Sequence, residues 1–136
     1  MIQQAETFLD THTLGHTSLL RVQSSNGAYL AIADVKRKPL ITVSSVEDEQ
    51  VIATYLGHEA GLYRRMPMIT AIAWSPDGTR IASGGSDGSL HIWEVQRALP
   101  LRTLIDLNEA SPVRALAWNG NTLTALCGEA TQVWQV

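Results

Sequence analysis

The sequence predicts an all-β protein built from repeated units of four short antiparallel strands. Runs of five or six residues alternate apolar with polar side chains, and turn sequences rich in glycine, asparagine, aspartate and proline separate these runs. The same features also return at a nearly constant spacing of 41 to 44 residues. The recurring pairs are Leu14-Gly15-His16 with Leu56-Gly57-His58, Trp74 with Trp118, and Trp93 with Trp134. A period of about 40 to 45 residues is typical of four-stranded repeat units.

The composition of the chain favours some classes of protein and disfavours others. The 136 residues are 45% hydrophobic and 17% charged, which is typical of one globular domain, and a net charge of −3 disfavours a generally basic nucleic-acid binder. No apolar run reaches the ~20 residues that span a membrane, and the N-terminus lacks the pattern of a signal peptide. The lone Cys127 fits a reducing, cytoplasmic location, and we expect it to be a buried hydrophobe.

The most regular stretch covers residues 69–95. A strand ending at Trp74 is followed by the turn Ser-Pro-Asp-Gly, a second strand of small residues, an Asp-Gly turn, and a third strand carrying Trp93-Glu94. Four features in this order resemble a WD40 repeat, in which Trp-Asp stands at the place of Trp93-Glu94. The resemblance implies WD40-type β-propeller blades of four antiparallel strands. It also implies a non-catalytic protein–protein interaction scaffold.

The flanks predict three such blades in the chain. Residues 17–58 form blade one, with strands at 19–24, 29–33, 40–45 and 51–56. Residues 59–111 form blade two, with a loop insertion at 59–68 and strands at 69–74, 80–83, 90–95 and 101–107. Residues 112–136 supply three strands of blade three, at 113–118, 122–127 and 131–136. Residues 1–16, by comparison with 51–58, form an outer strand that completes a third blade.

Three blades do not close a ring, because propellers typically have four to eight. Two copies would make six blades if the N-terminal strand of each copy completed the third blade of the other, so we expect a homodimer. The residues that would close it are Phe8, Leu9, Val133 and Trp134. Three alternatives stay open: a nine-bladed trimer, a partner that supplies four blades, and a longer propeller of which this is a fragment.

The resemblance assigns a structural hydrogen-bonded tetrad to blade two. Its members would be His58, Ser83, Asp87 and Trp93. Ser, His and Asp also suggest a catalytic triad. However, Ser83 lacks the Gly-x-Ser-x-Gly setting of an activated nucleophile, and the tetrad of the family is buried. We therefore expect a structural role and no enzyme activity.

Metal and cofactor sites are not expected. His12 and His16 have the spacing of two ligands on a helix, but the local pattern is strand and loop and no third ligand is near. The sequence also has no phosphate-binding glycine pattern and no cysteine pair.

In WD40 folds, the loop after the fourth strand and the loop between strands two and three share the top face, so the resemblance implies a basic top face where a partner would bind. The loop between strands two and three of blade one and the insertion before blade two bring together Lys36, Arg37, Lys38, Tyr63, Arg64, Arg65 and Met66. Charge favours an acidic protein or peptide there. The opposite face would be acidic, through Glu47, Asp48, Glu49 and Asp77. In the alternatives, these loops only cover the ring or seal the dimer, or the chain is a small-ligand or sensor module that uses the central channel.

Overall fold

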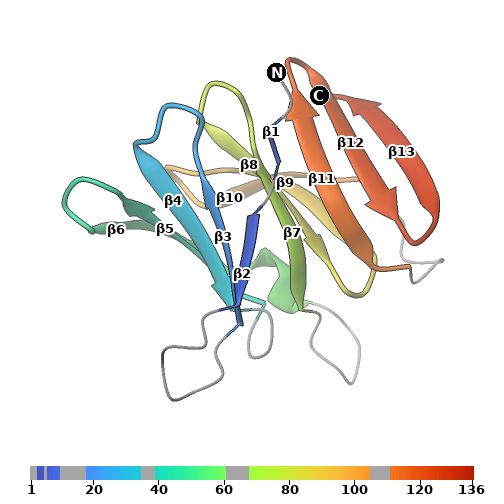
Figure 1. Ribbon diagram of the computed structural model, residues 1–136, viewed down its shortest axis with the longest axis horizontal. Helices are drawn as coiled ribbons and strands as arrows, with labels where there is room; N and C mark the ends of the chain where they lie inside the picture. Colours follow the sequence, from blue (N-terminus) through green and yellow to red (C-terminus); the bar gives the residue numbers. More distant parts are fainter. Residues whose placement is uncertain (1–2, 5, 10–17, 35–38, 61–67, 105–110) are drawn as a thin grey trace.

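Three antiparallel β-sheets stand side by side in a fan in the computed structural model (Figure 1). The structure describes residues 3–4, 6–9, 18–34, 39–60, 68–104 and 111–136. Within these residues the chain forms thirteen strands and one short 3₁₀ helix, η1 (Gly57–Ala60), and no α-helix. The fold is therefore all-β, as the sequence predicts.

Blade one contains four strands that follow one another in the chain. They are β3 (Ser18–Gln23), β4 (Tyr29–Asp34), β5 (Ile41–Ser45) and β6 (Val51–Tyr55). The turn after β3 depends on Gly27, which adopts φ +76°, and on the Asn26 side chain, whose Oδ1 accepts the Ala28 amide at 3.0 Å. These residues therefore form the hairpin that their sequence predicts.

Blade two contains the stretch that resembles a WD40 repeat. Its strands are β7 (Ile69–Trp74), β8 (Arg80–Gly85), β9 (Leu90–Glu94) and β10 (Leu99–Thr103). The fourth strand was expected at 101–107, whereas it begins at Leu99 and includes Pro100. Proline cannot donate to a β-ladder, but β10 is the outermost strand and pairs only with β9, so Pro100 is tolerated there.

Blade three contains β11 (Val113–Asn119), β12 (Thr122–Cys127) and β13 (Ala130–Gln135), each paired with the next. Its innermost strand β11 lies beside β7 of blade two, and β7 in turn lies beside β3 of blade one. In the described part of the chain, β13 pairs with β12 alone and its other edge is free. Blade three thus has the three strands expected for it.

The N-terminal segment pairs differently from the expected arrangement. Strand β1 (Gln3–Gln4) pairs with β11, and β2 (Glu6–Leu9), which contains Phe8 and Leu9, pairs with β3. Both pairings lie at the inner edges of blades of the same chain, whereas an outer strand beside β13 was expected. Pairing β2 with the next strand closes a short loop, which costs less conformational entropy than reaching the outer rim. Residues 10–16 of the expected strand lie outside the described residues.

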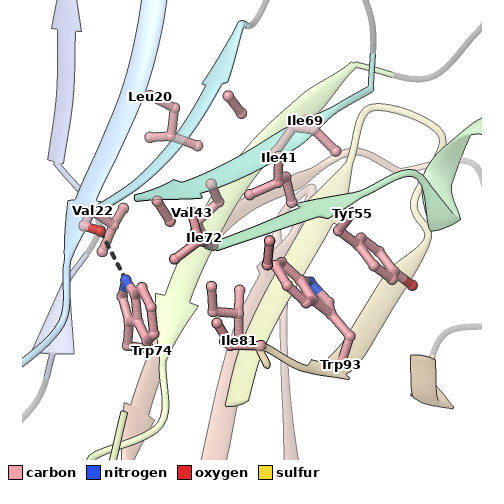
Figure 2. Packing of buried hydrophobic residues seen from close by; sticks show 14 residues of the cluster. Leu20, Val22, Ile41, Val43, Tyr55, Ile69, Ile72, Trp74, Ile81 and Trp93 are labelled. Atoms are coloured by element: carbon pink, nitrogen blue, oxygen red, sulfur yellow. Dashed lines mark hydrogen bonds between the residues drawn. The ribbon is translucent and has the colours of Figure 1, made fainter. Parts of the chain in front are cut away.

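Apolar side chains hold neighbouring blades together. Between blades one and two, Figure 2 shows Trp74, Trp93, Tyr55 and Ile81 converging from both sheets. The indole Nε1 of Trp74 donates to the Val22 carbonyl at 2.8 Å, which adds a hydrogen bond across this interface. Between blades two and three, a second cluster is built largely from the small residues of blade two and the larger ones of blade three. Its members include Ala71, Ala73, Ala82, Leu90, Ile92, Leu116, Trp118 and Leu123.

The distance between blades two and three depends on the absence of a side chain at Gly84. A Cβ at this position would collide with the Val113 side chain of β11. Close packing therefore sets the spacing of the two inner strands. Thr70 adds a polar contact here, because its hydroxyl donates to the Val113 carbonyl.

Candidate functional site

A buried group of polar and aromatic side chains lies where the end of blade one meets blade two. His58 comes from η1, Ser83 from β8, and Trp93 from β9. The chain can turn from β6 into η1 because Gly57 lies directly against the Tyr55 phenol ring, where any Cβ would collide. Glycine at this position thus allows His58 to enter the space between the blades.

The hydrogen bonds of this group form one continuous chain. Trp93 Nε1 donates to Ser83 Oγ at 3.1 Å, and Ser83 Oγ lies 2.8 Å from His58 Nε2. On the other side of the ring, His58 Nδ1 lies 3.1 Å from Ser89 Oγ, which donates to Asp87 Oδ1 at 2.6 Å. Ser89 uses its only proton on Asp87, so His58 must donate from Nδ1 and accept from Ser83 at Nε2. The neutral His58 ring is therefore the tautomer that is protonated at Nδ1.

Aromatic rings pack around this chain. Tyr55 stacks on Trp93 with ring centroids 4.4 Å apart and an interplanar angle of 2°. His58 stacks on His91 at 3.9 Å and 7°, and the Tyr55 hydroxyl lies 2.9 Å from His91 Nδ1. The stack therefore joins the outer strand of blade one to β9 of blade two.

Burial controls the charge of both histidines. Burial and, to a smaller extent, the neighbouring His91 lower the pKa of His58 to about 3, although the hydrogen bond with Ser83 acts in the opposite direction. Burial also lowers the pKa of His91, although the Asp87 carboxylate acts in the opposite direction. Burial raises the pKa of Tyr55 to about 12. The stacked pair is thus neutral at pH 7, which avoids two adjacent positive charges.

The geometry resembles a Ser–His–Asp relay, but it does not expose a nucleophile. The Ser83 side chain is 0% exposed and His58 is 2% exposed, so no substrate atom can reach the hydroxyl. A nucleophilic serine must be accessible to the carbonyl that it attacks. The arrangement satisfies buried polar groups and fixes the blade interface.

The structure brings together three of the four predicted tetrad residues in direct contact: His58, Ser83 and Trp93. Asp87 belongs to the same chain but reaches His58 only through Ser89. The sequence prediction did not include Ser89, Tyr55 or His91. An available signal was the pattern Asp-x-Ser at Asp87 and Ser89, because a hydroxyl two residues after aspartate commonly bonds to its carboxylate.

The predicted partner-binding residues of the top face belong to two loops that the structure does not describe. Lys36, Arg37, Lys38, Tyr63, Arg64, Arg65 and Met66 all lie outside the described residues, as do His12 and His16. The acidic loop at the opposite end is described, and Glu47, Asp48 and Glu49 are exposed there. The closure residues of β13 differ from each other, since Val133 is exposed whereas Trp134 packs against the cluster between blades two and three.

Other sites were sought in the described residues. These residues contain no group of three or more His, Cys, Asp or Glu side chains that could hold a metal ion. None of the helices found in them is long and apolar enough to cross a membrane. Cys127 is buried, as predicted, and burial raises the pKa of its thiol, which disfavours the reactive thiolate.

Comparison with known proteins agrees with this fold. The family model "WD domain, G-beta repeat" matches residues 49–94, which cover the end of blade one and most of blade two. This chain belongs to the WD40-repeat family. The outer strand β6 and the first three strands of blade two make up this WD40 match, so the polar chain from Asp87 to Trp93 lies within it.

Two curated relatives illustrate the similarity. WD repeat-containing protein 1 of Gallus gallus is 32% identical over 116 residues, which are 83% of this WD40 chain and 18% of that protein. Meiotic fizzy-related protein 1 of Schizosaccharomyces pombe is 39% identical over 57 residues, which are 42% of this chain and 13% of that protein. The chain thus spans less than a fifth of the length of either relative.

One solved structure shows the same fold. The β-propeller domain of Myceliophteria thermophila Cps50 (Swd1) superposes with a TM-score of 0.67 at 18% identity, and the match covers 97% of this chain and 38% of that one. WD40-repeat proteins are generally non-catalytic scaffolds, and the likeness of this chain to the solved structure shows the fold alone.

We expect Ser83→Ala to destabilise the chain by about 3 kcal/mol, because it leaves both Trp93 Nε1 and His58 Nε2 buried without a partner. Urea unfolding followed by tryptophan fluorescence measures this loss. Ser44→Ala is the matched control, since no hydrogen bond is seen to the half-buried Ser44 hydroxyl in the described residues, and it should change stability by less than about 0.5 kcal/mol. Equal losses in both variants would contradict the role of Ser83.

Acidification should also destabilise the chain. The folded pKa of His58 lies far below its unfolded value of 6.5, so the unfolded state binds more protons and stability falls as pH decreases below about 6.5. From pH 7 to pH 5, His58 alone should remove about 2 kcal/mol from the free energy of unfolding. Urea titrations at both pH values measure this, and His58→Gln should show a smaller loss. A pH-independent wild type would contradict the buried neutral histidine.

Proposed function

We propose that this WD40 chain is a non-catalytic interaction scaffold that works as half of a six-bladed ring, with a second copy as the other half. The observation that carries the proposal is the uncovered side of blade three, where the edge of β13 has no partner strand among the described residues and Val133 is 58% exposed. Exposed strand edges beside apolar side chains favour association with another chain.

From the pairing register between strands, the open face of blade three corresponds to the face of blade two that is covered. Val133 lies opposite Thr124, which lies opposite Ala117, so these three side chains share one face of blade three. In blade two the corresponding residues are Ile92, Ala82 and Ala73, which blade three covers almost completely. A further blade packed on blade three would bury Val133 in the same manner.

Blade one offers the complementary surface on its far side. Leu30 and Ile32 are half-buried on the face opposite to blade two, and Arg21 lies on the same face. Within the described part of the chain the Arg21 Nε is shielded from solvent and has no hydrogen-bond acceptor. An acceptor from a second copy would satisfy this nitrogen and remove the cost of burying it.

Ring closure would also require a strand beside β13. The proposed donor is the N-terminal segment of the second copy, which would exchange its pairing with β3 and β11 for pairing with β13. Such an exchange of an identical element between copies is a common route to dimers, because similar hydrogen bonds are made before and after it. The two inner edges would then face the centre of the ring.

Light scattering tests the proposal directly. The purified chain should have twice the monomer mass of 14.8 kDa, and Val133→Lys should yield monomers because it places a charge on the face that must be buried. Leu99→Lys on β10 is the matched control, since Leu99 is similarly exposed, at 49%, but lies on the outer rim of blade two.

Monomeric wild-type protein with a stable fold would contradict the dimer. The same result would favour a ring completed by other blades, which the greater length of the curated relatives also permits.

A further inference from the structure

A groove with a volume of about 480 Å³ lies between blades one and two, at the end that carries the loop of residues 46–50. Blade one contributes Asn26, Tyr29 and Ile52 to its walls. Blade two contributes the turn from Asp77 to Thr79, Arg80 of β8, the end of β9 with the segment that follows it, and Leu101 of β10. Both walls belong to one chain, so the groove does not depend on the proposed ring.

Two apolar side chains are presented to this groove by irregularities in the outer strands. Ile52 is the extra residue of a bulge in β6, because Val43 pairs with Ala53 and Ser44 with Val51. Leu101 is the extra residue of a corresponding bulge in β10, between Pro100 and Arg102. A bulge re-aims a side chain away from the alternation of the strand. A bulge in each outer strand thus places one aliphatic residue on each wall of the groove. The Ile52 side chain is 39% exposed and the Leu101 side chain is 49% exposed.

The surroundings of the groove are acidic. The described loops at this end carry the carboxylates of Glu47, Asp48, Glu49, Asp77 and Glu94 and only the guanidinium groups of Arg80 and Arg97. Both cations already have partners. Arg80 lies over the Trp118 ring of blade three at 4.9 Å, and Arg97 lies 3.7 Å from Glu94. Neither contact removes the positive charge, but five carboxylates against two guanidinium groups leave the described side chains at this end with a formal charge of −3, so the field at the groove is negative.

Asp77 has a free acceptor at the rim of the groove. Its Oδ1 accepts all three hydrogen bonds that hold the turn, from Ser75 Oγ, the Thr79 amide and Thr79 Oγ1. These bonds lower the pKa of the carboxyl group. Its Oδ2 accepts no hydrogen bond from the described residues, so a cationic ligand can bind there without disturbing the turn.

We propose that this groove docks an extended peptide segment of a partner protein in which arginine or lysine residues alternate with aliphatic ones. The aliphatic side chains would contact Ile52 and Leu101. The cations would pair with Asp77, and with Glu94 in place of its exposed partner Arg97. In an extended chain, alternate side chains point to opposite sides, so the aliphatic residues of the peptide can face the apolar walls while its cations face the charged rim. An acidic peptide or a nucleic acid would be repelled by the same carboxylates.

Fluorescence anisotropy with labelled hexapeptides tests the proposal. The library alternates arginine or lysine with leucine, isoleucine or phenylalanine. One control set replaces the basic residues with glutamate, and another replaces the apolar residues with serine. At least one basic–apolar peptide should bind saturably and with an affinity that falls as salt rises, whereas both control sets should bind at least tenfold more weakly.

Variants of the 136-residue chain locate the site. Leu101→Ser and Ile52→Ser should each weaken binding at least fivefold, while Leu99→Ser, an exposed leucine on β10 that does not line the groove, should change it less than twofold. Asp77→Asn retains the Oδ1 acceptor of the turn but removes the charge, so it should weaken binding and reduce the salt dependence. Far-UV circular dichroism checks that each variant keeps its β-structure.

Several outcomes would overturn the proposal. They are a library without a saturating member, equal binding of the glutamate peptides, and equal effects of Leu99→Ser and Leu101→Ser. A loss of solution mass in Leu101→Ser would show instead that a second copy occupies the groove.

Discussion

The buried hydroxyl of Ser83 is the group on which the order of blades one and two depends. It accepts from the Trp93 indole and donates to the His58 ring, so one oxygen connects β8, β9 and the end of blade one. Because every proton in the chain from Trp93 to Asp87 has a defined acceptor, the orientation of each group constrains the next. The Tyr55–Trp93 stack adds apolar contact to this network. The buried hydrogen bonds and the aromatic packing thus favour the same arrangement of blades one and two.

The residues that hold the blades together are different from those that can contact another molecule. Ser83 and His58, which resemble catalytic groups, are buried and hydrogen-bonded within the blade interface, so they serve the scaffold. The groups that can meet another molecule lie elsewhere: on the open face of blade three, around Val133, and in the groove between Ile52 and Leu101. A rigid core of this kind holds surface groups in fixed positions, which reduces the entropy lost on binding.

Local sequence signals predicted much of the fold. Blade two was predicted almost to the residue over β7 to β9, because its turns contain glycine at positive φ and its strands alternate regularly. The contacts of Ser83 with His58 and Trp93 also followed from the family pattern. These features depend on neighbours in sequence or on a repeated motif, and both can be read along the chain.

Features set by long-range geometry were not predictable. The Asp-x-Ser pattern indicates the bond from Ser89 to Asp87. The contact of Ser89 with His58 depends instead on how η1 approaches the β8–β9 turn, and no local pattern encodes that approach. The bulges at Ile52 and Leu101 appear only when two strands are placed in register. The pairing of β2 with β3 depends on which sheet edge is nearest, so Phe8 and Leu9 were assigned to another edge.

The ionisation of His58 tests most directly whether this network is a buried structural element. Two-dimensional NMR of the ¹⁵N-labelled imidazole would follow its two ring nitrogens from pH 8 to pH 4. The account predicts a neutral ring protonated at Nδ1 that does not titrate above pH 4, since burial and His91 lower the pKa to about 3. A His58 that titrates near pH 6.5, or one protonated at Nε2, would contradict it.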